Sequence, residues 1–322
     1  MSNTLFILII EGFVLNHLTR RNFAKAVITS VVAIGCSQSQ ANATQKQSLI
    51  IDTHVHCFAG NKNKDFPYHS DGPYQPDAIT SPQILLAQIK KAGVDFAVVV
   101  HPEPYQDDHR YLEYCLSVGK KQLKGTCLFF ANKGDSVRLM GELVKRNPGK
   151  IVALRFHAYN KEKLPPFEKP ELRILWKAAS ELGLNIQLHF EPRYAAGFEP
   201  LIKEFSKTKV IIDHMGRPFD GSIEENKRVL GWAKFENTIM KASSLPDPKM
   251  FPERDAGIVI KDLVNRFTPM RLIYGGGFDD KSDAQSYRAY WEKTRSYLAA
   301  LSPLEQSMIM GGNAQRLFQF EG

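Results

Sequence analysis

Histidine is the residue through which this chain could do most chemistry, because five of its nine histidines end short apolar runs. The five are His56, His101, His157, His189 and His214. A neutral imidazole binds zinc and similar divalent metals, and it also accepts or donates a proton near neutral pH. If the runs are parallel strands of one barrel, their C-terminal ends form the face where active sites are built. The pattern therefore predicts a metal or acid–base site on that face.

The spacing singles out His54 and His56, which lie two residues apart in the first apolar run. Side chains at this spacing share one face of a strand, so both rings would point into the barrel mouth. His189 and His214, at the ends of two later runs, strengthen the prediction of a metal site. The alternative is that these histidines are hydrogen-bonded side chains of the core.

Three more polar residues share the expected face. Glu191 follows His189 by two residues and could add a metal ligand or a base. Lys241 and Ser243 lie in the seventh apolar run and could point into the same mouth. The alternative for each of them is a structural contact at the rim or in the core.

Eight short runs rich in β-branched residues alternate with amphipathic stretches of helical length from residue 48 onward. The predicted strands are Leu49–His56, Phe96–His101, Gly125–Ala131, Ile151–His157, Asn185–Glu191, Lys209–His214, Thr238–Ser243 and Arg271–Gly275. The predicted helices are Ser81–Ala92, Asp107–Lys121, Asp135–Arg146, Pro170–Leu182, Pro200–Lys207, Ile223–Phe235, Pro252–Phe267 and Ser282–Leu301. Continuous apolar strands are typical of a parallel sheet covered by helices, and eight units favour one α/β domain, a (β/α)8 TIM barrel over residues 44–322.

The composition and charge of the chain exclude several classes of protein. Of the 322 residues, 43% are hydrophobic and 24% charged, which excludes a disordered chain, a coiled coil and a collagen-like repeat. The net charge of +8 is spread along the chain without a long basic run, and the aromatic residues do not interleave with a basic stripe. We therefore expect no nucleic-acid partner. No sequence signal indicates an oligomeric state.

The N-terminal segment is typical of an export signal. The pair Arg20-Arg21 precedes the apolar run Ala26–Gly35, and a small-x-small site follows at residues 41–43. Paired arginines favour the twin-arginine route, so residues 1–43 are predicted to be a signal peptide and the mature protein periplasmic. The apolar run is too short to span a bilayer, which requires about 20 residues.

Cysteine positions leave one alternative open. Cys36 follows the apolar run, so a lipid anchor there competes with cleavage after residue 43. The other three cysteines are Cys57, Cys115 and Cys127, and an odd number gives no complete disulfide framework.

Four motifs, in order along the chain, resemble the amidohydrolase-related branch of the amidohydrolase superfamily. They are Ile-Asp-Thr-His-Val-His at 51–56, Asn-Ile-Gln-Leu-His at 185–189, Val-Ile-Ile-Asp-His-Met-Gly-Arg-Pro at 210–218 and Met-Gly-Gly-Asn-Ala-Gln-Arg-Leu-Phe at 310–318. The third motif and Leu-Arg-Phe at 154–156 are most similar to the 2-pyrone-4,6-dicarboxylate lactonases and sugar-lactone hydrolases. The resemblance covers residues 48–320 and implies a (β/α)8 hydrolase.

The resemblance also implies roles for individual residues. His54, His56 and His189 match the ligands of a divalent metal, zinc above all, or the polarising side chains of metal-free members. His214 matches a residue that contacts substrate or moves a proton.

Substrate binding is implied for a second set of residues. Arg155 and Arg217 match positions that bind substrate carboxylates, for which the rigid guanidinium fork is well suited. His157 is expected beside them. The implied partner is a small anionic or lactone substrate.

One departure from the family pattern concerns the end of the eighth strand. Family members usually read Trp-Gly-Ser-Asp-Phe-Pro there, and that Asp binds metal and acts as the general base. This chain reads Tyr-Gly-Gly-Gly-Phe-Asp-Asp at 274–280, which puts Gly277 in place of the Asp. Asp279 or Asp280 could reach back as the catalytic carboxylate, because consecutive glycines allow unusual backbone paths. The competing hypotheses are catalysis without this carboxylate and loss of hydrolysis.

The leading functional hypothesis is therefore an exported hydrolase that opens a lactone or similar ester ring by attack of an activated water. A decarboxylase of a small unsaturated acid on the same barrel is the second hypothesis. The third is a catalytically silent barrel that binds an exported metabolite, which the Gly277 departure would favour.

Overall fold

The computed structural model describes residues 48–246, 249 and 252–321. The predicted signal peptide (residues 1–43) and the lipid-anchor alternative at Cys36 lie outside the described residues. In the part of the chain that is described, no helix is both long and apolar enough to cross a membrane.

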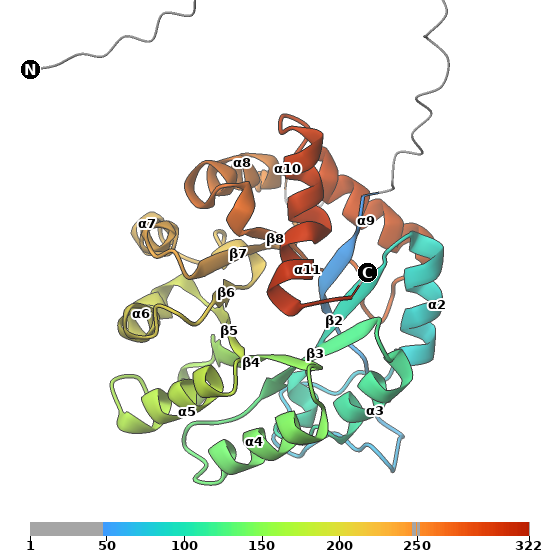
Figure 1. The fold of residues 1–322 in the computed structure, drawn as a ribbon, viewed down its shortest axis with the longest axis vertical. Helices are drawn as coiled ribbons and strands as arrows, with labels where there is room; N and C mark the ends of the chain where they lie inside the picture. Colours follow the sequence, from blue (N-terminus) through green and yellow to red (C-terminus); the bar gives the residue numbers. More distant parts are fainter. Residues whose placement is uncertain (1–47, 247–248, 250–251, 322) are drawn as a thin grey trace, which may run out of the picture. The chain divides into compact units, whose positions relative to one another are not determined.

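The strands form one parallel eight-stranded sheet in which sequence order is spatial order. The strands are β1 (Ile51–Val55), β2 (Phe96–Val100), β3 (Leu123–Leu128), β4 (Ile151–Ala158), β5 (Asn185–Phe190), β6 (Val210–Ile212), β7 (Thr238–Ala242) and β8 (Leu272–Tyr274). Figure 1 shows most of the helices around the outside of this ring of strands. Nearly every strand residue is buried, as expected for a sheet with helices on one face and a packed interior on the other. The prediction of a (β/α)8 barrel is confirmed.

The helices occupy the intervals between the strands. The α-helices are α2 (Pro82–Ala92), α3 (Arg110–Gly119), α4 (Ser136–Arg146), α5 (Pro170–Glu181), α6 (Ala195–Glu204), α7 (Ile223–Gly231), α8 (Ala256–Phe267), α9 (Ala284–Ser296), α10 (Pro303–Ser307) and α11 (Asn313–Phe318). Single turns are η1 (Glu103–Tyr105), η2 (Lys161–Lys163), η3 (Pro192–Tyr194), η4 (His214–Gly216), η5 (Trp232–Lys234), η6 (Pro269–Arg271) and the π-helical η7 (Met308–Gly312).

Several predicted helix boundaries differ from the structure by four or five residues, and the start of α6 shows why. The sequence pattern placed Pro200 at the start of its helix, where proline is favoured. In the structure α6 begins at Ala195, and Pro200 lies inside it.

Side chains close the ring between its first and last strands. The hydroxyl of Thr53 donates to the carbonyl of Tyr274 at 2.6 Å, and the Gly276 amide donates to Asp52 at 2.7 Å. The Asp52 carboxyl also accepts from the Tyr287 hydroxyl at 2.8 Å. Burial raises the pKa of Asp52 to about 6. We refer to these contacts as the β1–β8 seam.

An apolar cluster fills one end of the barrel. Phe318 and Phe320, from α11 and the segment after it, pack against residues near the starts of the strands, among them Ile51, Val98 and Ile273. The opposite end, formed by the C-terminal ends of the strands, holds the polar side chains.

Candidate active site

Five imidazole rings follow one another around the C-terminal mouth. The centroid distances are 5.0 Å for His56–His54, 4.6 Å for His54–His214, 4.9 Å for His214–His189 and 5.3 Å for His189–His157. They come from β1, β4, β5 and the turn after β6. The structure thus brings together His54 and four of the five histidines predicted at strand ends. His101 lies apart, stacked on His109 at 4.4 Å with its Nε2 on the Gln106 carbonyl.

The five rings are neutral at pH 7. Burial, together with the charges of Arg155 and Lys241, lowers the pKa of His56 to about 4 and that of His214 to about 3. Burial likewise holds the pKa well below its ordinary value in the remaining three, His54, His157 and His189. A neutral ring keeps one lone pair free to accept a proton or bind an electrophile.

Hydrogen bonds fix two of the rings. The Nδ1 of His56 lies 2.8 Å from the Val100 carbonyl, which can only accept, so the proton is on Nδ1 and the lone pair on Nε2. The Nδ1 of His214 lies 2.9 Å from the Ser243 hydroxyl and 2.7 Å from that of Ser244. These serines hold the ring of His214 against the mouth.

The turn after β6 has a left-handed backbone at four consecutive residues. The φ values are 55° at His214, 58° at Met215, 73° at Gly216 and 53° at Arg217. Residues with a side chain adopt this region at a cost, and such strain concentrates at functional sites. Gly216 must be glycine for a second reason, because a Cβ there would lie 2.6 Å from Cγ1 of Val229.

A buried carboxylate that the sequence analysis missed lies at the centre of the site. Asp213 Oδ2 accepts from Nε of Arg155 at 3.0 Å and from Nε2 of Gln187 at 2.8 Å. Its Oδ1 lies 3.0 Å from Nζ of Lys241. Burial alone would raise the pKa of Asp213, but the charges of Lys241 and Arg155 hold it well below its usual range. The signal was present, since Asp213 directly precedes His214 at a strand end.

A second missed acid lies in the loop after β2. Glu103 accepts a hydrogen bond from the hydroxyl of Tyr159, and its Oε2 lies 3.8 Å from Nε2 of His157. Burial raises the pKa of Glu103. The residue belongs to η1, outside any strand pattern, so nothing in the sequence marked it.

Two of the cavities at the mouth reach both His189 and His214. One, of about 640 Å³, is lined by His189 and His214 together with Arg155, Glu103 and other residues. The other, of about 330 Å³, also reaches His189 and His214 and is lined by Arg217. The two histidines therefore separate a wide cavity from a smaller cationic one.

The two arginines predicted to bind substrate differ in how far their side chains are exposed. Arg155 is 4% exposed and its guanidinium pairs with Asp213, so its first role is to hold that carboxylate. Arg217 is 25% exposed and pairs with Asp220 at 2.7 Å at the edge of its cavity. Arg217 is therefore better placed than Arg155 to meet an incoming carboxylate.

Asp279 and Asp280 follow the glycine run after β8 and are exposed. Asp279 lines the 640 Å³ cavity, but its Oδ1 accepts from the Lys281 amide at 2.9 Å and the Ser282 hydroxyl at 2.8 Å. Within the described ranges, neither carboxylate forms a hydrogen bond or ion pair with a histidine. Glu191, the other carboxylate considered, pairs with Arg193 at 2.7 Å.

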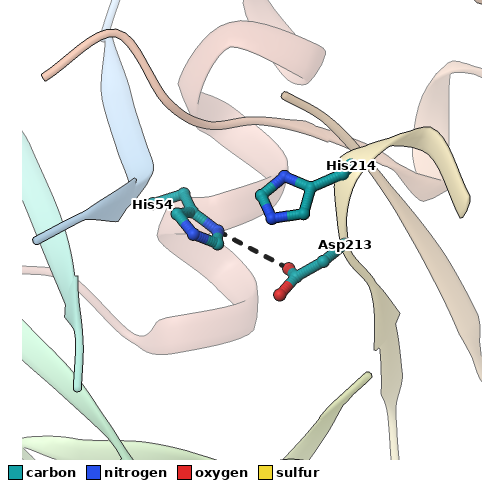
Figure 2. Close-up of side chains that lie close together, drawn as sticks. All are labelled: His54, Asp213 and His214. Carbon is teal, nitrogen blue, oxygen red and sulfur yellow. Dashed lines mark ion pairs between the residues drawn. The ribbon is translucent and has the colours of Figure 1, made fainter. Parts of the chain in front are cut away.

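A group of three side chains could hold a divalent cation. The donor atoms of His54, Asp213 and His214 lie within 4.8 Å of one another, and Nδ1 of His54 lies 3.7 Å from Oδ1 of Asp213. Figure 2 shows His54 and Asp213 facing each other with His214 beside them. Imidazole and carboxylate suit zinc. Of the predicted ligands, His54 belongs to this group, whereas His56 and His189 do not. The ammonium of Lys241 contacts two of the three donors and does not fit a divalent ion there.

Comparison with known proteins identifies the family to which the chain belongs. A family model described as amidohydrolase matches residues 51–320. No curated protein matches the chain.

Solved structures share the fold. A "probable 2-pyrone-4,6-dicarboxylic acid hydrolase" from Acinetobacter baumannii, with citric acid bound, is 21% identical with a TM-score of 0.69 and covers 84% of this chain and 99% of its own. A protein with the same proposed name from Pseudomonas putida is 20% identical, with a TM-score of 0.69 and coverages of 85% and 99%. A zinc-bound amidohydrolase from Burkholderia multivorans is 14% identical, with a TM-score of 0.64 and coverages of 85% and 100%.

Proposed function

The chain belongs to the amidohydrolase family of hydrolytic enzymes, and from this premise we propose that it opens a lactone or similar ester ring of a small carboxylated substrate. The observation that carries the proposal is the convergence of five neutral imidazoles with the Arg217 guanidinium at one mouth. The bound citric acid of the Acinetobacter protein supports a small anionic substrate.

The smaller cavity, which is lined by Arg217, would orient the substrate. A carboxylate of the substrate would pair with the guanidinium of Arg217, which offers donors in a planar fork. The ester carbonyl would then lie over His189 and His214, which line both cavities. Asp220 already pairs with Arg217 and keeps the guanidinium in place before the substrate arrives.

Water activation falls to the imidazoles. The oxygen of a water held between His189 and His214 forms a bond to the carbonyl carbon, while its proton passes to the free lone pair of His214. Ser243 and Ser244 orient the His214 ring for this transfer. The Nε2 of His157 and the Nδ1 of His189, which have no hydrogen-bond partner among the described residues, can donate to the developing oxyanion.

Collapse of the tetrahedral intermediate breaks the bond to the ring oxygen. That oxygen requires a proton as it leaves. Glu103 borders the wide cavity and has a raised pKa, which favours its protonated form relative to an exposed glutamate. We assign this proton to Glu103 or to the His214 imidazolium formed in the preceding step.

The experiment is a hydrolysis assay on a panel of lactones with and without ring carboxylates, 2-pyrone-4,6-dicarboxylate included, in which ring opening is followed by absorbance. Carboxylated lactones should be turned over, and Arg217→Met should raise KM by at least tenfold with a smaller effect on kcat. Release of CO2 instead of ring opening would favour the decarboxylase alternative. Absence of turnover with ligand-induced stabilisation would favour the silent barrel.

We also propose export to the periplasm through residues 1–43. The Arg20-Arg21 pair and the small residues at 41–43 support it. Cell fractionation tests it, because Arg20→Lys/Arg21→Lys should retain the chain in the cytoplasm. A shift in mass at Cys36 would instead reveal a lipid anchor.

A further inference from the structure

Lys241 places a positive charge wholly inside the barrel. Its side chain is 0% exposed, and its ammonium lies 3.0 Å from Oδ1 of Asp213 and 3.0 Å from the carbonyl of Thr53. The Nδ1 of His54 lies 3.4 Å away. An ammonium has three hydrogens to donate, so these three acceptors satisfy it completely.

The end of β8 leaves the room that this side chain needs. A Cβ at Gly275 would lie 3.1 Å from Cδ of Lys241 and 2.8 Å from Oγ1 of Thr53. A larger residue there would therefore press on the lysine stem. Gly275, at the end of the eighth strand, thus provides space for the Lys241 side chain. Two residues later, at Gly277, the family pattern would provide a carboxylate.

The charges around the centre are already balanced. The buried carboxylates of Asp213 and Asp52 oppose the positive charges of Lys241 and Arg155, and the two neighbouring histidines are neutral. A divalent ion would leave two uncompensated positive charges in the buried group. Zinc lies about 2.0–2.2 Å from its nitrogen and oxygen ligands. Bound to Asp213 and His54, it would be held close to the ammonium that already contacts both.

We propose that the Lys241 ammonium is the resident cation of this centre and takes the place of the divalent metal that His54, Asp213 and His214 could otherwise hold. It positions the Asp213 carboxylate and the His54 ring and excludes a metal by its charge. This inference concerns metal binding alone and does not depend on the lactone substrate, so the two proposals can fail separately.

The test is metal binding by the full-length chain. Zn²⁺ or Co²⁺ is titrated calorimetrically into protein stripped by a chelator, and metal content after dialysis is measured by elemental analysis. The wild type should retain less than about 0.1 equivalent. Lys241→Met, which keeps the unbranched stem but removes the ammonium and its charge, should bind about one equivalent at least 100-fold more tightly. Lys281→Met is the matched control, because Lys281 is exposed and lines the same mouth; it should bind no more metal than the wild type.

The acquired site must use the stated ligands. His54→Ala added to Lys241→Met should abolish the gain, and the Tm of Lys241→Met alone should rise with Zn²⁺, since a ligand that binds only the folded state stabilises it. A folded Lys241→Met protein that gains no site would overturn the proposal. So would a wild type that takes up one tight equivalent lost in His54→Ala, a measurement that needs no folded lysine variant.

Discussion

Replacing Asp213 with asparagine should destabilise the fold strongly, because one carboxylate neutralises two buried cations. Lys241 is 0% exposed and Arg155 is 4% exposed, so neither can turn to water when the negative charge is removed. Removal of one partner from a buried ion pair costs about 3–5 kcal/mol. The asparagine oxygen still accepts one hydrogen bond, so we expect a loss of about 4 kcal/mol.

This loss can be measured by thermal unfolding followed by circular dichroism. A domain of this size loses about 2 °C of Tm per kcal/mol, so Asp213→Asn should lower Tm by about 8 °C. The matched control is Asp262→Asn, since Asp262 is exposed and pairs with Arg266 one helical turn away. Such an exposed pair is worth about 0.3–0.5 kcal/mol, which predicts a change of about 1 °C.

A double variant separates charge from shape. Lys241→Met added to Asp213→Asn removes one of the two unpaired cations, so it should recover part of the lost stability. A fall of less than about 2 °C for Asp213→Asn alone, with the fold intact, would refute the reasoning that the carboxylate holds both cations. A double variant less stable than Asp213→Asn would also contradict it.

Three further predictions concern acid, the glycine run and the proposed base. Because burial lowers the pKa of His56 to about 4 and that of His214 to about 3, the unfolded chain binds more protons than the folded chain below pH 6.5. The Tm should therefore be highest above pH 6.5 and fall toward pH 4. Asp52, whose pKa is raised to about 6, has the opposite effect on stability, but it is a single group. Gly277→Asp should lower Tm without raising the hydrolysis rate, because φ is 120° and a Cβ would lie 2.7 Å from Tyr290; an unchanged Tm would contradict this. His214→Ala should lower kcat by about 10²–10⁴ while the circular dichroism spectrum stays unchanged, and full activity would exclude His214 as the base.

The fold could be predicted because each strand is a continuous apolar run with its own polar boundary. All eight predicted strands exist, with ends that differ by at most three residues. The start of α6 was misplaced because Pro200 signals a helix start in isolation, whereas the helix begins at Ala195, directly after the turn η3.

The histidines of the site could be predicted because their position at strand ends is a local property. The partners of Asp213 could not, since Arg155, Gln187 and Lys241 come from three different strands and meet only through the barrel's curvature. Glu103 was missed because its loop has no periodicity. The export signal and the roles of Asp279 and Asp280 remain predictions.

The β1–β8 seam determines where the barrel is expected to open locally. Neighbouring strands elsewhere in the described sheet are joined by backbone ladders, whereas the side chains of Thr53 and Asp52 form hydrogen bonds across the seam. A junction of few bonds opens at lower free energy than a ladder. Native-state amide exchange should therefore be faster at Gly276 than at the centres of β4 and β5. The seam lies beside His54 and Lys241. Local opening there would admit water to the centre while the rest of the barrel stays folded.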